Sequence, residues 1–212
     1  MTPLTHMRQN YSLAGLSEAD AGGDPFGLFH LWLAEALAVG LPEPNAFTLA
    51  TATPDGHPSA RVMLLKALDE RGFTFFTNYG SRKGRELADN PRAAMAFLWL
   101  QLERQVRIEG RVEVVTPAES DEYFAVRPVE SRLGAWASPQ STVIPDRPFL
   151  ERKHAEFAAN HPDGAVPRPP HWGGYRVLPE AIEFWQGRPS RLHDRIRFRK
   201  DAGRWVRERL AP

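Results

Sequence analysis

The C-terminal stretch 183–200, EFWQGRPSRLHDRIRFRK, carries a basic side chain at every second position over half of its length. These residues are Arg191, His193, Arg195, Arg197 and Arg199, and they alternate with Leu192, Asp194, Ile196 and Phe198. On a β-strand, side chains two apart share a face, so a strand would align five basic groups. Because like charges side by side repel, this row predicts that part of the strand faces an anion.

Two alternatives apply to the same row. A helix would group Arg191, Arg195 and Arg199 at i, i+4 spacing. Arg197 and Arg199, next to the turn-like residues 201–203, could also be the solvated end of the row. The two-residue period of the apolar positions and the turn residues at 187–190 and 201–203 favour the strand, with 204–210 as its return partner.

A second basic group follows a strand-like run in TNYGSRKG, residues 77–84. Gly80 predicts a turn, after which Ser81, Arg82 and Lys83 begin a helix. Free backbone N–H groups at a helix start, together with two cations, form a phosphate site. The alternative is an ordinary helix start whose basic side chains point into solvent.

Two further patterns place polar side chains around possible anion sites. Arg61 and Lys66 bound an apolar strand but are five residues apart, so one shared site requires a bulge, a strand end or backbone contacts. Tyr123, Arg127 and Ser131 follow a helical i, i+4 row, provided that helicity resumes after Pro128. Such a row suits a phosphate ester. Edge charges and a surface Tyr–Arg pair are the plain alternatives.

The composition is that of a water-soluble globular chain with one domain. Of its 212 residues, 42% are hydrophobic and 25% charged, the net charge is +1, and cysteine is absent. The absence of cysteine excludes thiolate chemistry and disulfides, and it favours a reducing cytoplasm. There is no membrane-length apolar run, no signal-like N-terminus and no metal-binding or hydrolase motif, so we expect no membrane, nucleic-acid or metal partner.

The elements that must position these residues are many short strands decorated by helices. Residues 1–23 predict a flexible arm, and 24–212 a single domain. Asp24, Pro25 and Gly40 cap, start and close one helix, and the spacing of Thr116 and Glu119 predicts a capping box. The expected strands are 46–53, 59–68, 73–78, 93–102, 105–115, 172–178, 181–187 and the arginine row; the expected helices are 24–40, 81–90, 116–128 and 146–164. This order predicts a small antiparallel barrel or sandwich.

Seven motifs resemble, in order, those of the pyridoxamine 5′-phosphate oxidases. They are RVMLLK, FFTNYGSRKG, LERQVRIEGRVE, YFAVRP, SRLGAWAS-QS, WGGYRV and IEFWQGRPSRLHDR. The resemblance runs from about residue 8 to residue 212, and EFWQG followed by RLHDR is its most specific part.

The resemblance implies a mainly β fold with helices, namely a six-stranded antiparallel split β-barrel, assembled as a homodimer with FMN between the subunits. It implies FMN contacts from Arg61, Val62, Met63, Leu64, Leu65, Lys66, Phe76, Thr77, Arg82, Lys83, Gln105, Gln140, Ser141, Trp185 and Arg195. It implies substrate contacts from Arg8, Tyr11, Lys66, Tyr123, Arg127, Ser131, Arg191 and His193. Of these, Arg191 and His193 would lie over the pyridine ring as the catalytic pair.

The implied reaction is the oxidation of pyridoxamine or pyridoxine 5′-phosphate to pyridoxal 5′-phosphate, with O₂ reduced to H₂O₂. Two positions depart from the family pattern: Asn10 stands where an acid is usual, and Phe76 where tyrosine is frequent. The alternatives are a related flavin oxidase acting on another ring, such as a phenazine, and a split-barrel protein that holds flavin or haem without turnover.

Overall fold

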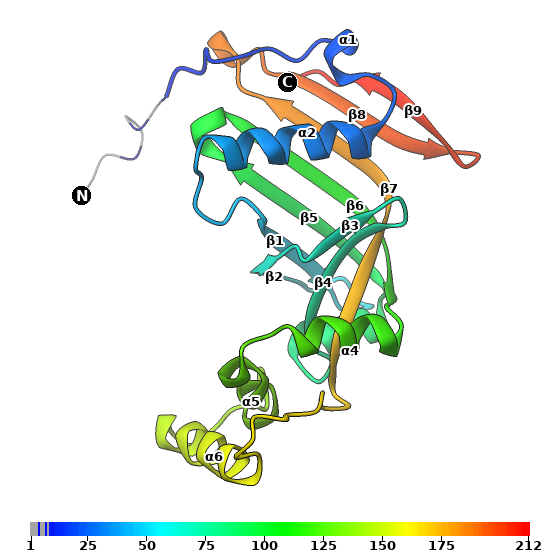
Figure 1. The fold of residues 1–212 in the computed structure, drawn as a ribbon. Coiled ribbons are helices and arrows are strands. Elements are labelled where there is room, and N and C mark those ends of the chain that lie inside the picture. The colour runs from blue at the N-terminus through cyan, green and yellow to red at the C-terminus, as the bar shows by residue number, and fades with distance from the viewer. Residues whose placement is uncertain (1–3, 5–6, 8) are drawn as a thin grey trace.

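A computed structural model describes residues 4, 7 and 9–212 of the chain (Figure 1). Within them, nine strands form one antiparallel sheet. They are β1 Ala46–Ala52, β2 Pro58–Leu64, β3 Ala67–Asp69, β4 Gly72–Asn78, β5 Arg92–Trp99, β6 Arg104–Val114, β7 Trp172–Gln186, β8 Asp194–Asp201 and β9 Arg204–Arg209. The helices are α1 Glu18–Ala21, α2 Pro25–Ala38, α3 Arg82–Asp89, α4 Pro117–Ala125, α5 Val129–Ala137 and α6 Arg147–Asn160, with short 3₁₀ turns at Leu100–Leu102 and Pro189–Arg191.

Six strand positions close into the predicted split barrel because one expected strand is broken in two. The run 59–68 is interrupted at Leu65 and Lys66, whose N–H groups bond the carbonyls of Asn45 and Thr74, each at 2.9 Å. Consequently β2 pairs with β1, while β3 pairs with β4. The path β1, β2–β3, β4, β7, β6, β5 therefore returns to β1. The β8–β9 hairpin adds the remaining two strands.

Strand β7 is one continuous strand where the sequence predicted two. Strand β6 pairs along its whole length. On the opposite edge, β4 pairs with the residues up to Val177, and β8 pairs with the residues from Ala181 onward. Pro179 falls between these two partners, where its missing N–H costs no hydrogen bond on that edge. The barrel and the C-terminal hairpin thus share one strand: the first part of β7 belongs to the barrel, and its last part pairs with the hairpin.

The core inside the barrel is aromatic, and α2 covers it. Asp24 caps α2 by accepting from the N–H groups of Phe26 and Gly27, and Pro25 is its first residue, as predicted. In Figure 1, α2 lies across β5 and β6. It buries Phe29 completely, with ring centroids 5.0 Å from both Phe73 and Phe97. No helix in the described part of the chain has the length and apolarity needed to cross a membrane.

The arginine row differs from its prediction at its start. Strand β8 begins at Asp194. In the 3₁₀ turn before it, Ser190 and Arg191 have left-handed φ angles of 58° and 61°. Arg191 and His193 therefore lie in a loop before the strand. The alternation holds from Arg195 onward, with Ile196 and Phe198 fully buried on the other face, and the helical alternative is wrong.

The anions that face the row within the protomer are carboxylates of neighbouring strands. Arg195 Nε lies 2.9 Å from Glu183 on β7. Arg197 and Arg199 both pair with Glu208 on β9, at 2.6 and 2.7 Å. These arginines are thus paired rather than simply solvated.

Part of the expected N-terminal arm is held against the C-terminal hairpin. Ser17 and Asp20 form a capping box at α1. Arg209 bonds Glu18 at 2.6 Å and Asp194 at 2.8 Å, and the N–H of Leu16 donates to Asp194 at 3.0 Å. Residues 16–21 of the expected arm thus contact the hairpin, and the flexibility of the arm stays a prediction. Arg8 lies outside the described residues.

We expect Phe29→Ala to lower the free energy of unfolding by about 3–5 kcal/mol, because it leaves a cavity in a fully packed aromatic core. Leu31→Ala is the control, since Leu31 belongs to the same helix but is 52% exposed. Urea unfolding of both variants at equal protein concentration measures the difference. Equal losses would contradict the placement of the core beneath α2.

Candidate functional site

The first group of polar side chains lies at the start of α3, and we call it the α3 cluster: Arg61, Thr77, Arg82, Lys83, Glu86 and Gln140. Ser81 caps the helix by accepting from the N–H of Gly84, as the sequence predicted. A Cβ at Gly84 would lie 2.1 Å from the carbonyl oxygen of Tyr79. Glycine at this position therefore lets the helix start pack directly against the chain leaving β4.

Lys83 is the centre of the α3 cluster. Its side chain is buried, with Nζ 3.0 Å from Gln140 Oε1 and 3.2 Å from Thr77 Oγ1. Burial, with a smaller contribution from the Arg61 charge, lowers the pKa of Lys83. Among the described residues, no carboxylate lies within 4 Å of its ammonium group. A buried cation held only by neutral oxygens is suited to an anionic ligand.

Glu86 partly balances the other two cations of the cluster. Its side chain is 5% exposed, 2.8 Å from Arg82 Nε and 3.4 Å from Arg61 Nη2. Burial opposes its ionisation, but hydrogen bonds from Ser59, Thr51 and Arg82 outweigh burial and lower the pKa of Glu86 to about 2. Three cations thus face one carboxylate. The sequence analysis missed Glu86, although its i, i+4 spacing from Arg82 was visible.

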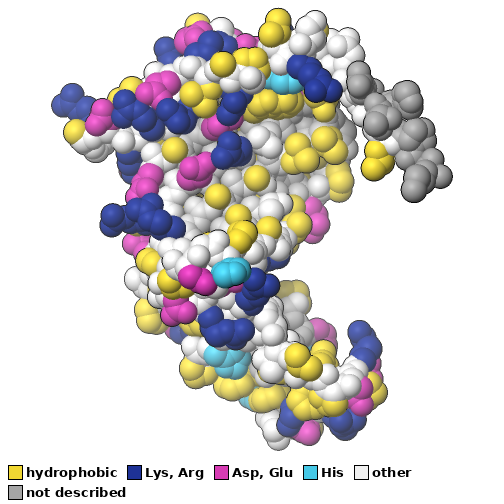
Figure 2. All heavy atoms as spheres, turned by 180° about the vertical axis from the view of Figure 1, so that it is seen from behind, with side chains coloured by type: hydrophobic (Ala, Val, Ile, Leu, Met, Phe, Trp, Pro, Cys, Tyr) yellow, Lys and Arg dark blue, Asp and Glu magenta, His cyan; other side chains and the backbone are white. Residues whose placement is uncertain are grey.

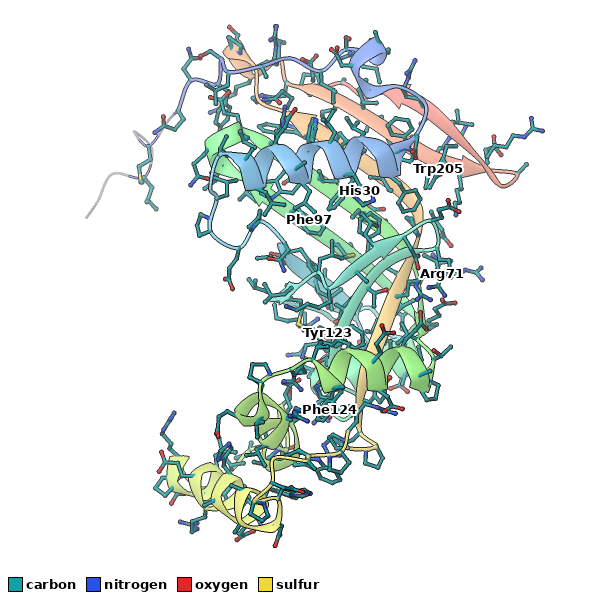
Figure 3. The ribbon with its side chains drawn as sticks, viewed as in Figure 1. His30, Arg71, Phe97, Tyr123, Phe124 and Trp205 are labelled. Atoms are coloured by element: carbon teal, nitrogen blue, oxygen red, sulfur yellow. The ribbon has the colours of Figure 1, made fainter. Side chains whose placement is uncertain are left out.

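The second group surrounds a cavity of about 310 Å³ between β3, β4 and α4, which we call the α4 cleft. Lys66, Phe76 and Tyr123 are among its lining residues. The Tyr123 ring stacks on Phe76 with centroids 4.1 Å apart, and Lys66 Nζ lies 5.9 Å from the Tyr123 ring centre. Tyr123 lies on the side of α4 that faces the strands (Figure 3). The break between β2 and β3 lets Lys66 reach this cleft while Arg61 reaches the α3 cluster.

Arg127 lies next to the α4 cleft in a different way from the predicted helical row. Helix α4 ends at Ala125, so Arg127 is in the loop before α5. Its guanidinium stacks over Trp172 at 4.6 Å, and its Nη1 is buried without a hydrogen-bond partner among the described residues. Burial lowers the pKa of Arg127. Ser131, on α5, is exposed and does not line the cleft.

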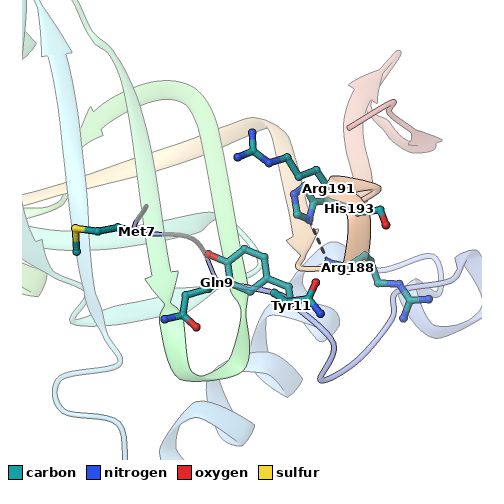
Figure 4. Close-up of a pocket in the computed structure, with 8 residues that line it drawn as sticks. Met7, Gln9, Tyr11, Arg188, Arg191 and His193 are labelled. Atoms are coloured by element: carbon teal, nitrogen blue, oxygen red, sulfur yellow. Dashed lines mark hydrogen bonds between the residues drawn. The ribbon is translucent and has the colours of Figure 1, made fainter. Parts of the chain in front are cut away.

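The third group, which we call the β8 pocket, is a cavity of about 740 Å³ beside the loop before β8. Arg191, His193 and Tyr11 line it (Figure 4). The His193 ring centre lies 4.6 Å from that of Trp185 and 5.9 Å from that of Tyr11. The N–H of Arg188 donates to His193 Nδ1 at 3.1 Å, so the neutral ring carries its hydrogen on Nε2.

The strand register places two further predicted residues, Gln105 and Arg195, beside Trp185 at the β8 pocket. Gln105, Trp185 and Arg195 are directly opposite one another on β6, β7 and β8, so they form one row across the sheet. Arg195 is also fixed by Glu183 and by the carbonyl of Ala211 at 2.9 Å. Other predicted FMN contacts lie away from the β8 pocket. Ser141 is exposed and follows Gln140 of the α3 cluster, and Val62 on β2 is 69% exposed.

One protomer does not bring all predicted residues together. Trp172 lies beside the α4 cleft, and Trp185 lies beside the β8 pocket. They are the first and the second-last residue of the same strand, β7. At a rise of about 3.3 Å per residue, the strand separates them by roughly 40 Å. Figure 1 likewise shows α4 and β8 at opposite ends of β7. A small ligand that contacts both ends requires a second copy of the chain.

Comparison with known proteins identifies the family. A model described as "Pyridoxamine 5′-phosphate oxidase" matches residues 33–161. A second model, "Pyridoxine 5′-phosphate oxidase C-terminal dimerisation region", matches residues 172–212. The chain belongs to the pyridoxamine 5′-phosphate oxidase family. The matched dimerisation region contains β7, β8 and β9, and it implies a homodimer.

Curated relatives of this oxidase family match the whole chain. The chain is 61% identical to a pyridoxine/pyridoxamine 5′-phosphate oxidase of Burkholderia vietnamiensis, with all of both chains covered. It is 64% identical to a protein of the same name from Pseudomonas paraeruginosa, over 99% of this chain and 98% of that one.

Two solved structures share the fold. PhzG from Burkholderia lata, solved in complex with tetrahydrophenazine-1-carboxylic acid, superposes with a TM-score of 0.90 at 35% identity, covering 96% of this chain and 100% of that one. A pyridoxamine 5′-phosphate oxidase-related, FMN-binding protein from Nostoc punctiforme has a TM-score of 0.69 at 19% identity, over 87% and 97% of the two chains. The predicted split barrel is confirmed.

The charge of Glu86 should stabilise the fold in a pH-dependent way. A carboxyl whose pKa is lowered by folding contributes stability above its ordinary pKa of 4.5, and this contribution is lost as the pH falls toward 2. We expect Glu86→Gln to be less stable than the unmodified chain at pH 6 and to show a flatter loss between pH 4.5 and 3. Urea unfolding at pH 6, 4.5 and 3 measures this.

The matched control for Glu86→Gln is Glu151→Gln. Glu151 forms an i, i+4 pair with Arg147 like that of Glu86 with Arg82, but its side chain is 62% exposed. We expect it to change stability by less than about 0.5 kcal/mol at any of these pH values. Coinciding curves for Glu86→Gln and the unmodified chain would show that the buried carboxylate contributes nothing.

Proposed function

We propose that this chain is an FMN-dependent oxidase that converts pyridoxamine and pyridoxine 5′-phosphates to pyridoxal 5′-phosphate, with O₂ as acceptor and H₂O₂ as by-product. The observation that carries the proposal is that two lysines without carboxylate partners, Lys83 and Lys66, lie in sites on either side of β4. Thr77 contacts Lys83 in the α3 cluster, whereas the preceding residue, Phe76, stacks on Tyr123 in the α4 cleft. Two neighbouring anion sites suit a reaction between two phosphorylated molecules.

The residues of the α3 cluster fit the phosphate of FMN. Lys83 is a buried cation without a carboxylate partner, and the cluster has two more cations than anions. The start of α3 adds backbone N–H groups directed at the same place. FMN, when bound, supplies the chemistry of accepting two electrons and passing them to O₂. The chain's own task is to hold and orient the two reactants.

The α4 cleft is assigned to the phosphate of the substrate. Lys66 and Tyr123 line it, and the unpaired Nη1 of Arg127 lies beside it. A buried guanidinium N–H without a partner is costly, and an anion would satisfy it. This support favours a phosphorylated vitamer over the phenazine-type substrate with which the PhzG relative was solved, because three groups that bind one phosphate are of less use to a ring without it.

The β8 pocket of a second copy completes the site in this proposal. Arg191 would orient the pyridine ring and stabilise charge that develops at the reacting carbon. His193 would donate a hydrogen bond from Nε2, since Nδ1 already accepts from the Arg188 N–H. Trp185, Gln105 and Arg195 would contact the flavin from the same side.

The direct test is oxygen consumption by the purified protein with FMN. We expect a yellow dimer that oxidises pyridoxine 5′-phosphate and pyridoxamine 5′-phosphate, produces H₂O₂, and is at least about a hundredfold less effective on unphosphorylated pyridoxine, since it loses charge-assisted phosphate contacts. Faster oxidation of a reduced phenazine carboxylic acid than of either phosphate would favour the phenazine-type reading. A coloured protein without any turnover would favour a binding protein.

Arg191→Met should distinguish the role of the loop before β8 from the role of strand β8 itself. We expect kcat/KM for pyridoxine 5′-phosphate to fall about a hundredfold while FMN content is unchanged, because one well-placed charged donor contributes roughly 2.7–4 kcal/mol to a transition state. Arg197→Met is the control, since Arg197 is paired with Glu208 on β9. Stopped-flow flavin reduction and absorbance ratios measure both quantities. Equal damage in the two variants would contradict this division.

A further inference from the structure

A network of five charged side chains lies beneath the α4 cleft, and the proposed function gives it no role. We call it the Arg176 network: Asp69, Arg71, Glu113, Glu119 and Arg176. Arg176, in β7, has a side chain only 4% exposed. Its Nη1 lies 2.7 Å from Glu113 on β6, its Nη2 lies 2.5 Å from Glu119 on α4, and its Nε lies 4.0 Å from Asp69 at the end of β3.

Arg71 makes a second bridge between the same two walls. It lies in the turn between β3 and β4 and contacts Asp69 at 2.6 Å and Glu119 at 3.0 Å. Both arginines thus reach Oε1 of Glu119. The other oxygen of Glu119 accepts from the backbone N–H and hydroxyl of Thr116, each at 2.9 Å, within the predicted capping box. Glu119 is therefore bound on both oxygens.

The network connects the two elements that carry the groups of the cleft. Asp69 follows Lys66 by three residues, and Glu119 precedes Tyr123 by four residues, one helical turn, on α4. Arg71 spans from Asp69 to Glu119, whereas Arg176 bonds Glu119 and Glu113, and its buried Nε, 4.0 Å from Asp69, has no hydrogen-bond partner among the described residues. The Arg71 bridge and the Arg176–Glu119 pair thus tie α4, which carries Tyr123, to the strands on the Lys66 side of the cleft.

The same bridges decide the charge that an entering anion meets. Asp69 and Glu119 line the cleft together with Lys66. Without a partner, each carboxylate would repel an anion held by Lys66. Both are paired with guanidinium groups, whereas Glu122 on the same lining forms no ion pair among the described residues; none of the three lies within 4 Å of the Lys66 ammonium group. Spacing and charge therefore point to the same task.

We propose that Arg176, assisted by Arg71, is a positioning residue that fixes the gap between Lys66 and Tyr123 and holds the carboxylate of Glu119 in ion pairs, so that the cleft accepts a phosphate monoester. The identity of that monoester as a vitamer rests on the proposed function; the binding of phosphate does not. Arg176 acts through Glu119 rather than by touching the ligand's reacting atoms.

Arg176→Met tests the proposal in the FMN-loaded protein. We expect KM for pyridoxine 5′-phosphate to rise about tenfold, with kcat changed less than twofold and FMN content unchanged. Arg176→Lys should recover part of the loss, because an ammonium restores the charge but lacks the planar fork that bonds Glu113 and Glu119 together. A merely structural role would instead lower the amount of active protein without altering KM.

A readout independent of turnover is the binding of inorganic phosphate, measured by calorimetry. The part of the binding that Lys66→Met abolishes reports the cleft, as distinct from the α3 cluster. We expect Arg176→Met to weaken that part about tenfold. If the unmodified protein shows this Lys66-dependent binding but oxidises neither phosphate, the proposed function fails and the inference stands. If it shows none, the inference is overturned.

Two further variants keep the test decisive if Arg176→Met does not fold. Arg71→Met removes the partly exposed bridge, whose side chain is 57% exposed, and should raise KM about threefold. The matched control is Glu180→Gln, which removes a carboxylate that also bridges two arginines, Arg92 at 2.9 Å and Arg111 at 3.2 Å, away from the cleft. An unchanged KM and phosphate affinity in both Arg71→Met and Arg176→Lys would overturn the proposal.

Discussion

The continuity of β7 is the constraint on which the rest of the molecule depends. Its one edge serves β4 and then β8, with Pro179 placed where neither partner needs a donor. Because a single strand crosses from the barrel to the hairpin, the α4 cleft and the β8 pocket of one chain lie at opposite ends of that strand. The separation of roughly 40 Å follows from the strand rise alone, and it is the physical reason why a shared site needs two chains.

Ion pairs between basic and acidic side chains occur both on the surface and in the interior. The row that begins at Arg195 is neutralised by Glu183 and Glu208, and Arg176 by Glu113 and Glu119. Figure 2 shows acidic and basic side chains interspersed over the rear face of the molecule. Lys83 in the α3 cluster and Lys66 in the α4 cleft differ from these arginines, because neither has a carboxylate within 4 Å among the described residues. Their charges are therefore not offset by a direct ion pair, as those of Arg195, Arg197 and Arg176 are.

Local signals made most of the fold predictable. Caps at Asp24, Ser81 and Thr116 placed three helices correctly, and alternation placed the strands. The errors arose where distant contacts decide. Pro179 is a breaker by itself, yet β6 pairs through it. The left-handed turn at Ser190 and Arg191 has no glycine to signal it. The partners of Glu119 could not be inferred, because Arg176 lies 57 residues away in the sequence.

The candidate residues were found mainly through family resemblance rather than spacing. Spacing alone put Tyr123 and Arg127 on one helix, whereas α4 ends between them and Trp172 holds the guanidinium instead. The packing of an arginine on a tryptophan from another element is invisible to periodicity.

The opposite placement of the α4 cleft and the β8 pocket has a consequence for inheritance. In a homodimer with two shared sites, each subunit contributes one half to each of them. A subunit damaged only at its α4 end, mixed with one damaged only at its β8 end, would form a dimer with one intact site and one doubly damaged site. Two defective alleles could therefore complement each other within one assembly, while two lesions at the same end could not.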